Sequence, residues 1–268
     1  MSAALRAGIK ALVPPLLVDL LRRMRTPVVG FSGTYDSWEA ASAAASGYDS
    51  AAILSKVAVA TRKVAAGEAV FERDSVLFDE IHYSWPLLAS LLYVATVAGS
   101  LRVIDFGGSL GSSWRQNRRF IDRLTVPVTW RVVEQQNFVA EGRRSFSTEV
   151  LQFHDSIADA AAGGADVVLF SSSLCYVAEP ARCVDEAWQS GCRFLIVDRL
   201  PLIRGARDRI RQQHVHEPIY EASYPIRLFG SDNLFDSLFA RWQLIEQWDS
   251  DLQPDPESHC WGFLLERK

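Results

Sequence analysis

The sequence predicts an α/β protein with a Rossmann-like, doubly wound and mostly parallel sheet of seven strands. Short runs rich in β-branched residues alternate with helix-length segments over residues 101–198. Four of these five runs are almost continuously apolar, as expected of parallel strands covered by helices on both faces. A glycine-rich turn follows the first run, and open α/β sheets bind ligands at that end of their strands.

The expected parallel strands are joined by helical connectors, which implies right-handed crossovers. They are residues 101–106, 129–134, 150–153, 166–171 and 193–198. Residues 242–248 and 259–265 form two more runs with no helix between them, joined by a segment that contains Pro and Asp. We expect this pair to close one edge of the sheet as an antiparallel hairpin.

The first part of the chain, residues 1–98, is expected to form a helical lid over a core of residues 99–268, as one compact unit. Its alanine-rich periodicity is typical of helices. Asp36 and Glu39 resemble a capping box. A second helix ends at Gly67, and a third runs from about residue 84 to Gly99 with Pro86 in its first turn. We expect the polar segment 202–228 to complete the lid.

Composition favours a soluble globular protein. Of the 268 residues, 49% are hydrophobic and the net charge is −4, so neither disorder nor a broad nucleic-acid-binding surface is expected. The four cysteines form no C-x-x-C pair, which favours reduced thiols and a cytoplasmic location. No apolar run is long enough to span a membrane.

The amino terminus leaves three alternatives open. Arg6 and Lys10 precede an apolar stretch that Pro14 and Pro15 interrupt, and three arginines follow it. Docking onto the protein's own body is the simplest interpretation, weak peripheral contact with a membrane is the second, and a secretory signal is the least favoured.

The glycine-rich turn spans residues 105–112 and contains Asp105, Gly107, Gly108, Ser109 and Gly111. Glycine lets a backbone turn sharply and lets a ligand approach it closely. The G-G-x-x-G spacing differs from the G-x-G-x-x-G that holds a pyrophosphate, which favours a nucleoside ligand without a diphosphate. The alternative is a turn that only makes room for helix packing.

Further polar residues follow the next strands. Glu134 ends the second strand, where a carboxylate can accept both hydroxyls of a ribose, and Gln135 follows it. After the third strand, Asp155 is a candidate to bind the amino group of an adenine, and Ser156 is a candidate to bind in the same region. The alternative is that this segment only caps the next helix. Ser171 ends the fourth strand.

These residues resemble those of class I S-adenosylmethionine-dependent methyltransferases, and among them a group encoded near saccharide-biosynthesis genes. The resemblance covers nearly the whole chain and rests on residues 30–38, 47–49, 72–75, 105–112, 132–135 and 213–215. It implies that the cofactor's methionine lies over residues 107–111, its ribose on Glu134 and its adenine near Asp155 and Ser156. The fourth strand lacks the acidic or Asn-Pro-Pro-Tyr ending of some amino-group methyltransferases, so the resemblance does not identify the methyl acceptor.

Methyl transfer needs a base only when the acceptor is a hydroxyl or a protonated amine. His214 is the favoured candidate because histidine titrates near neutrality, with His216 second and Asp198 at the end of the fifth strand also included. We expect no metal site, because hard cations prefer carboxylates to imidazoles.

Aromatic and basic residues supply the acceptor-binding candidates. These are Tyr176, Tyr220, Tyr224 and Arg73. A buried ion pair between Arg73 and Asp74 is the alternative for that pair. The arginines at 204, 207, 209 and 211 are most simply a solvated helix face, and recognition of a phosphate is the more specific alternative.

The sequence thus predicts an S-adenosylmethionine-dependent methyltransferase that acts on a hydroxyl of a saccharide or related small polar metabolite, such as a sugar nucleotide. Methylation at nitrogen or carbon, and a homodimer, are open alternatives. A non-catalytic, nucleoside-binding partner of a glycan-assembly complex is the rival from another class. A nicotinamide-dependent oxidoreductase is weaker, because its G-x-G-x-x-G is absent.

Overall fold

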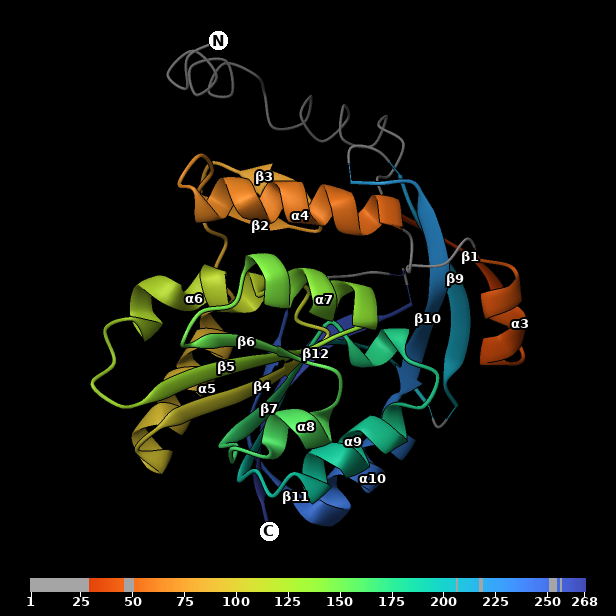
Figure 1. The fold of residues 1–268 in the computed structure, drawn as a ribbon. Helices are drawn as coiled ribbons and strands as arrows, with labels where there is room; N and C mark the ends of the chain where they lie inside the picture. The colour runs from red at the N-terminus through yellow and green to blue at the C-terminus, as the bar shows by residue number, and fades with distance from the viewer. Residues whose placement is uncertain (1–28, 46–50, 206, 217–218, 251–254, 256) are drawn as a thin grey trace, which may run out of the picture.

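The computed structural model describes residues 29–45, 51–205, 207–216, 219–250, 255 and 257–268. They form one ten-stranded sheet with helices on both faces, and a separate two-stranded sheet above it (Figure 1). The alternatives for the amino terminus fall on residues outside this description. No helix in the described ranges is long and apolar enough to cross a membrane.

The centre of the sheet is parallel and mostly matches the strands expected from sequence. Its strands are β4 (Leu101–Phe106), β5 (Val128–Val133), β6 (Leu151–His154), β7 (Val167–Ser171) and β8 (Phe194–Ile203). They pair in the order β8-β7-β4-β5-β6, so β4 lies between β7 and β5. This confirms the mostly parallel, Rossmann-like sheet.

Helices cover the two faces of the sheet in separate groups. On one face, α6 (Ser112–Ile121) and α7 (Gln136–Ser145) pack with α5 (Trp85–Ala98) against the apolar side chains of β4 and β5. On the other, α8 (Ile157–Ala161) lies against β4, β5 and β6, α9 (Pro180–Gln189) packs beside α8, and α10 (Ser231–Arg241) contacts the strands that precede and follow it. A short 3-10 helix, η1 (Leu174–Tyr176), follows β7.

The strand β12 (His259–Arg267) pairs antiparallel with β8 on one side and with β11 (Trp242–Asp249) on the other. The residues between β11 and β12 lie mostly outside the described part of the chain, and β11 is the last strand on that side of β8.

Three further strands were not expected, so the sheet has ten strands where seven were predicted. They are β1 (Val29–Tyr35), β9 (Arg209–Val215) and β10 (Ala222–Gly230), which pair antiparallel in the order β1-β9-β10. The end of β10 then pairs parallel with β8, where Phe229 lies opposite Leu202. Arg209 and Arg211 therefore lie on a strand and not on a helix face.

The polar composition of β9 explains why the sequence did not reveal it. Gln212 bonds to the carbonyl of Ala44 on one side of the strand, while Gln213 faces a cavity on the other. A strand whose two faces both contact polar partners lacks the alternation of apolar and polar residues that marks a strand half-buried in a core.

The amino-terminal part contains strands as well as helices. After β1 come α3 (Trp38–Ala43), α4 (Ala51–Ala65), the hairpin of β2 (Phe71–Arg73) and β3 (Val76–Phe78), and then α5. Ser37, and not Asp36, caps α3 by accepting a hydrogen bond from the Ala40 amide at 3.1 Å. Gly99 ends α5 with a left-handed φ of 69°, as predicted. Leu87 and Leu91 of α5 are buried in the same core as β4.

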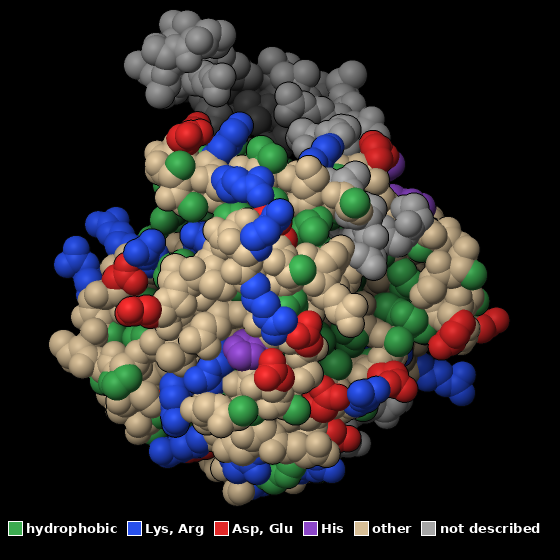
Figure 2. Space-filling view, in the orientation of Figure 1, with side chains coloured by type: hydrophobic (Ala, Val, Ile, Leu, Met, Phe, Trp, Pro, Cys, Tyr) green, Lys and Arg blue, Asp and Glu red, His purple; other side chains and the backbone are tan. Residues whose placement is uncertain are grey.

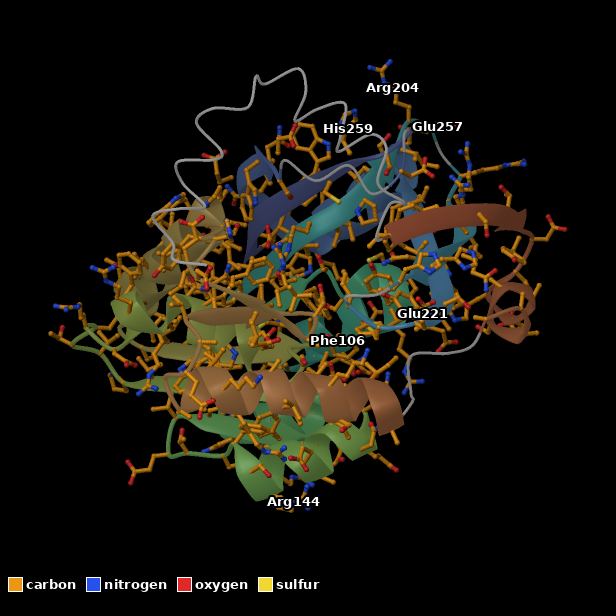
Figure 3. All side chains as sticks on the ribbon, turned by 90° about the horizontal axis from the view of Figure 1, so that it is seen from above. Phe106, Arg144, Arg204, Glu221, Glu257 and His259 are labelled. Carbon is orange, nitrogen blue, oxygen red and sulfur yellow. The ribbon has the colours of Figure 1, made fainter. Side chains whose placement is uncertain are left out.

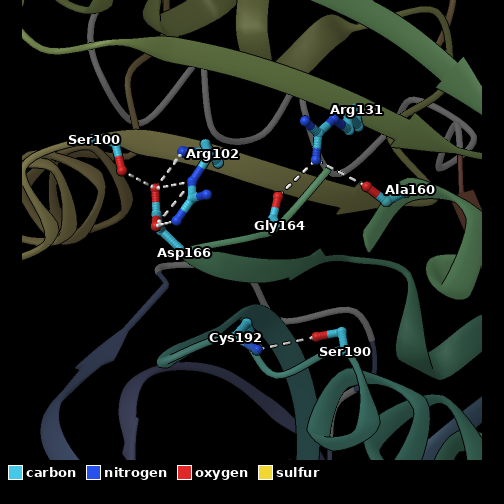
Figure 4. A network of polar contacts seen from close by, with 8 residues as sticks. All are labelled: Ser100, Arg102, Arg131, Ala160, Gly164, Asp166, Ser190 and Cys192. Carbon is cyan, nitrogen blue, oxygen red and sulfur yellow. Dashed lines mark hydrogen bonds and ion pairs between the residues drawn. The ribbon is translucent and has the colours of Figure 1, made fainter. Parts of the chain in front are cut away.

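One ion pair and several hydrogen bonds link the parallel strands at the edge of the sheet away from the candidate site (Figure 4). The Arg102 guanidinium donates to Asp166 at 2.6 Å, and the Ser100 hydroxyl donates to the same carboxylate at 2.7 Å. Arg131 donates to the carbonyls of Ala160 and Gly164 at 2.9 and 2.7 Å. These contacts join β4, β5 and β7 to the turn after α8.

Candidate functional site

A cavity of about 520 Å³ lies at the carboxyl ends of β4, β5, β7 and β8. Its volume is within the range of small-molecule sites. The loops after these strands line it, together with the β2–β3 hairpin and one face of the β1-β9-β10 sheet. Seen from above, Phe106 of its lining lies near the middle of the molecule, whereas Arg204, Glu257 and His259 lie together at a distant edge (Figure 3).

The glycine turn after β4 contributes its backbone to this cavity. Gly107, Gly108 and Ser109 are in the lining, and Gly111 is not. A Cβ at Gly107 would lie 2.6 Å from the Ser173 Cβ, and one at Gly108 would lie 2.6 Å from the Asp105 Cγ. The protein's own packing therefore requires these glycines, and the same bend brings the main chain to the cavity wall.

Glu134 meets this turn from the end of β5. Its Oε1 accepts a hydrogen bond from the Ser109 amide at 3.2 Å and its Oε2 accepts one from the Gln135 amide at 2.9 Å. Burial raises the pKa of Glu134, and the two backbone hydrogen bonds oppose that rise. Each carboxylate oxygen keeps a lone pair for a ligand donor. Gln135 also lines the cavity.

Asp105 lies behind the turn and not in the cavity lining. Its side chain is 1% exposed, and its Oδ2 accepts a hydrogen bond from the Trp130 indole at 2.9 Å. Burial raises the pKa of Asp105 to about 7. Asp105 therefore supports the loop from beneath, next to Gly108.

The two candidates after β6 have different surroundings. Asp155 lines the cavity, and Arg143 donates to it at 2.9 Å. Ser156 accepts a hydrogen bond from the Asp159 amide at 3.0 Å and so caps α8, which is the alternative that the sequence left open. Ser156 is not in the cavity lining.

Three consecutive serines, the last residue of β7 and the two that follow it, line the cavity. Ser171 donates to Asp198 at 3.1 Å and accepts from Arg199 at 2.7 Å. The buried hydroxyl of Ser173 has no hydrogen-bond partner among the described residues. It is therefore a polar group that is available to a ligand.

A wall of tyrosines faces the serines. The Tyr176 hydroxyl donates to Gln213 Oε1 at 2.9 Å, and Gln213 Nε2 donates to the Tyr224 hydroxyl at 3.2 Å. The rings of Tyr176 and Tyr224 are almost perpendicular, with centroids 5.4 Å apart. Burial raises the pKa of both tyrosines, so both remain neutral hydroxyls. Tyr220 completes this part of the lining.

The three residues expected to supply a base lie outside the lining. His214 is on the opposite face of β9 from Gln213, with its Nε2 2.6 Å from the Ser32 hydroxyl. His216 contacts Glu221 at 3.2 Å, and Asp198 is buried and accepts from the Trp248 indole at 3.1 Å. Side chains alternate across a strand, so the cavity face of β9 carries Gln213 and not His214.

No three His, Cys, Asp or Glu side chains in the described segments form a group suited to a metal ion.

The β2–β3 hairpin brings Arg73 and Asp74 to the cavity. The Arg73 guanidinium lies 5.8 Å from the centroid of the Phe78 ring. No ion pair joins Arg73 to Asp74 in the described structure, so the contacts do not support the alternative of a buried ion pair between them. Asp74, Arg199 and Gln213 are cavity residues that the sequence had not assigned to the site.

Unusual backbone conformations concentrate around the same cavity. Within the described ranges, the non-glycine residues with positive φ are Asp74, Ser75, Ser109, Ser172 and Arg199. Four of them line the cavity, and Ser75 adjoins it. At Arg199 the pairing of β8 with β12 is interrupted, as in a bulge. Such conformations cost free energy and cluster at functional sites.

No protein-family model matches the sequence, and no curated protein matches it. Solved structures do. The N-terminal domain of EvdMO1, with S-adenosylhomocysteine bound, is 12% identical with a TM-score of 0.50, and the match covers 78% of this chain and 96% of that one.

Two methyltransferases are further neighbours. Magnesium protoporphyrin IX methyltransferase (ChlM) from Synechocystis PCC 6803, with S-adenosylmethionine bound, is 13% identical with a TM-score of 0.45. The match covers 82% of this chain and 100% of that one. The glycopeptide N-methyltransferase MtfA, complexed with S-adenosylmethionine, is 14% identical with a TM-score of 0.44. The match covers 68% of this chain and 87% of that one. At such identities a likeness concerns the fold alone: the chain has a mostly parallel, Rossmann-like fold similar to that of the EvdMO1 N-terminal domain.

Proposed function

We propose that this protein is an S-adenosylmethionine-dependent methyltransferase acting on a small molecule. The observation that carries the proposal is the meeting of the Glu134 carboxylate with the backbone of residues 107–109 in one cavity at the strand ends. In Rossmann-like sheets this position holds the ribose and the adjoining part of a nucleotide or nucleoside ligand.

The residues present fit this cofactor. Glu134 would bind the ribose hydroxyls, the main chain of residues 107–109 would lie against the methionine part, and Asp155 would approach the adenine. The buried Ser173 hydroxyl supplies one further unpaired polar group in the lining. The bound cofactor provides an electrophilic methyl group on a sulfonium.

The protein's own residues then have to hold the acceptor in line with that methyl group and exclude water. The hydrogen-bonded wall of Tyr176, Gln213 and Tyr224 holds its side chains in fixed positions, which suits orientation of a ligand. Aromatic faces beside fixed polar groups suit a sugar ring, so O-methylation of a saccharide or related polar metabolite is the reaction we favour.

Calorimetry with S-adenosylmethionine and S-adenosylhomocysteine tests the proposal. We expect both to bind, and Glu134→Ala to weaken binding by roughly 1 to 3 kcal/mol, because a buried acceptor of ribose hydrogen bonds is lost. Glu149→Ala is the matched control, since Glu149 is exposed and outside the cavity lining. Absence of binding to the folded wild-type protein, or equal affinity in Glu134→Ala, contradicts the proposal.

A further inference from the structure

The β2–β3 hairpin presents Asp74 to the cavity in a defined conformation. The strands pair from Phe71 opposite Phe78 to Arg73 opposite Val76, which leaves Asp74 and Ser75 as a two-residue turn. Their φ angles are 52° and 67°, as in the type I′ turns that close tight hairpins. Asp74 therefore lies at the tip of the hairpin, over the cavity.

Contacts at both ends of the hairpin hold this tip in place. The Ser75 hydroxyl donates to the carbonyl of Ile219 at 3.1 Å, and Ile219 lines the cavity. At the base, the Ser112 hydroxyl of α6 donates to the buried Glu72. The hairpin is thus joined to the core helix on one side and to the tyrosine-bearing segment on the other.

Among the described carboxylates in the cavity lining, Asp74 is the one without a hydrogen-bond or ion-pair partner. Glu134 accepts two backbone hydrogen bonds and Asp155 is paired with Arg143. No described residue donates a hydrogen bond to Asp74 or forms an ion pair with it, although its side chain is exposed to the cavity. A carboxylate that is held in place but has no partner of its own is available to a ligand.

The surroundings of Asp74 suit proton transfer and recognition of hydroxyl groups. Desolvation by the surrounding cavity walls raises the pKa of Asp74, while the guanidinium groups of Arg73 and Arg199 lower it. A carboxylate with a raised pKa is a stronger base than one in water. Arg73, Tyr176 and Tyr224 provide donors and acceptors in the same lining for further polar groups of a ligand.

We propose that Asp74 is a catalytic residue that accepts a hydrogen bond from a hydroxyl of the acceptor and takes its proton, and that the acceptor is a neutral polyhydroxylated small molecule. This rests on the proposed methyltransferase function. The acceptor oxygen forms the new bond to the methyl carbon, the carbon–sulfur bond breaks with its electron pair passing to sulfur, and Asp74 receives the proton and releases it to solvent.

The first experiment separates this proposal from the proposed function. Calorimetry with S-adenosylhomocysteine is run on the wild-type protein, on Asp74→Asn and on the control Asp79→Asn, whose side chain is exposed just beyond the hairpin. We expect equal affinity in all three. If the wild-type protein does not bind, the proposed function is overturned; if only Asp74→Asn loses affinity, Asp74 belongs to the cofactor site and the present proposal is wrong.

The second experiment uses the protein loaded with S-adenosylhomocysteine and saturation-transfer NMR. The probes are neutral polyols (myo-inositol, methyl α-glucoside, methyl α-mannoside and mannitol) and, as an amine, glucosamine. We expect a polyol to bind the wild-type protein and Asp79→Asn, and its affinity to fall about tenfold or more in Asp74→Asn. Binding of no polyol, unchanged polyol binding in Asp74→Asn, or dependence on Asp74 for glucosamine alone overturns the proposal.

The third experiment measures methyl transfer to the polyol that binds. We expect Asp74→Asn to lower kcat on the order of a hundredfold or more, and Asp74→Glu to restore part of the loss. Unchanged kcat in Asp74→Asn excludes the proton-accepting role.

Discussion

At the scale of single residues, Asp105 shows how the turn after β4 is supported. Its carboxyl group is enclosed by the protein and contacts the Trp130 indole, and the space beside it is so small that only glycine fits at 108. Because its pKa is about 7, Asp105 keeps its proton in the folded protein between about pH 4 and pH 7, where the unfolded chain would have released it. The charged form is therefore the less stable one in the native structure.

This arrangement predicts a dependence of stability on pH. Because the native state binds the proton more tightly, the Asp105 contribution to the free energy of unfolding falls as pH rises from about 4 to about 7 and is constant above that. Asp105→Asn keeps a neutral side chain of the same shape, so its unfolding free energy should fall less over this range. Urea unfolding at several pH values measures the difference, with the exposed Asp122→Asn as control. Equal slopes in wild type and Asp105→Asn would contradict the assignment.

The cavity residues divide into those that sequence can reveal and those that it cannot. Glu134 and the glycine turn directly follow parallel strands, so the direction of the chain already places them at the ligand-binding edge. Asp74 reaches the same cavity only because a hairpin from a distant part of the chain folds over it. For His214 the residue type suggested a base, but the face of β9 on which it lies depends on pairing with β1 and β10.

At the scale of elements, one carboxylate joins the amino-terminal part to the core. Lys and Arg side chains run across the face formed by α4 and α7 (Figure 2). Arg62 of α4 contacts Glu141 of α7 at 2.5 Å, and Arg144 also donates to this carboxylate. Burial raises the pKa of Glu141, but the hydrogen bond from Arg144 and the other charges lower it overall.

We predict that Glu141→Gln loosens α4. The variant should lose on the order of 1 kcal/mol of stability, a modest value because Arg62 is half exposed and solvent screens the pair. Hydrogen exchange should speed up at the α4 amides more than at those of β4. Asp122→Asn, which breaks the exposed pair with Arg118, is the control and should change neither quantity. Faster exchange throughout the protein would point to general destabilisation.

The sequence predicted elements well where one face is apolar and poorly where both faces are polar. The apolar strands from β4 to β8 and the helix ended by Gly99 follow from patterns in the residues themselves. The strand β9 reads RIRQQHV, which carries too few apolar residues to indicate a strand. Its conformation is fixed by its neighbours on both sides, which no local pattern shows.

At the scale of the whole molecule, β8 belongs to two parts of the sheet. Its first residues pair with β7, and its last residues, Leu202 and Ile203, pair with β10. The floor of the cavity, at the ends of the parallel strands, and its wall, on β9 and β10, are therefore one continuous hydrogen-bonded structure. Leu91 of α5 is buried in the core with β4, so the amino-terminal part shares this core.

We therefore predict that residues 29–98 and the remainder of the chain unfold together. Circular dichroism and tryptophan fluorescence should report coincident transitions in urea, because Ile53 of α4 and Leu87 of α5 are buried in the same core as β4. At one hundred times its dissociation constant, S-adenosylhomocysteine should raise the free energy of unfolding by about 2.7 kcal/mol without splitting the transition. Two transitions, of which only one shifts with ligand, would show independent domains.

The continuity of floor and wall has a consequence for turnover. A sheet that is bonded along its length cannot part to admit a molecule, whereas the hairpin above it consists of two three-residue strands tied at its tip by one side-chain hydrogen bond. We expect movement of the hairpin to let S-adenosylhomocysteine leave the cavity and S-adenosylmethionine enter it. The rate of that exchange would then depend on the hydrogen bond from Ser75 to the carbonyl of Ile219.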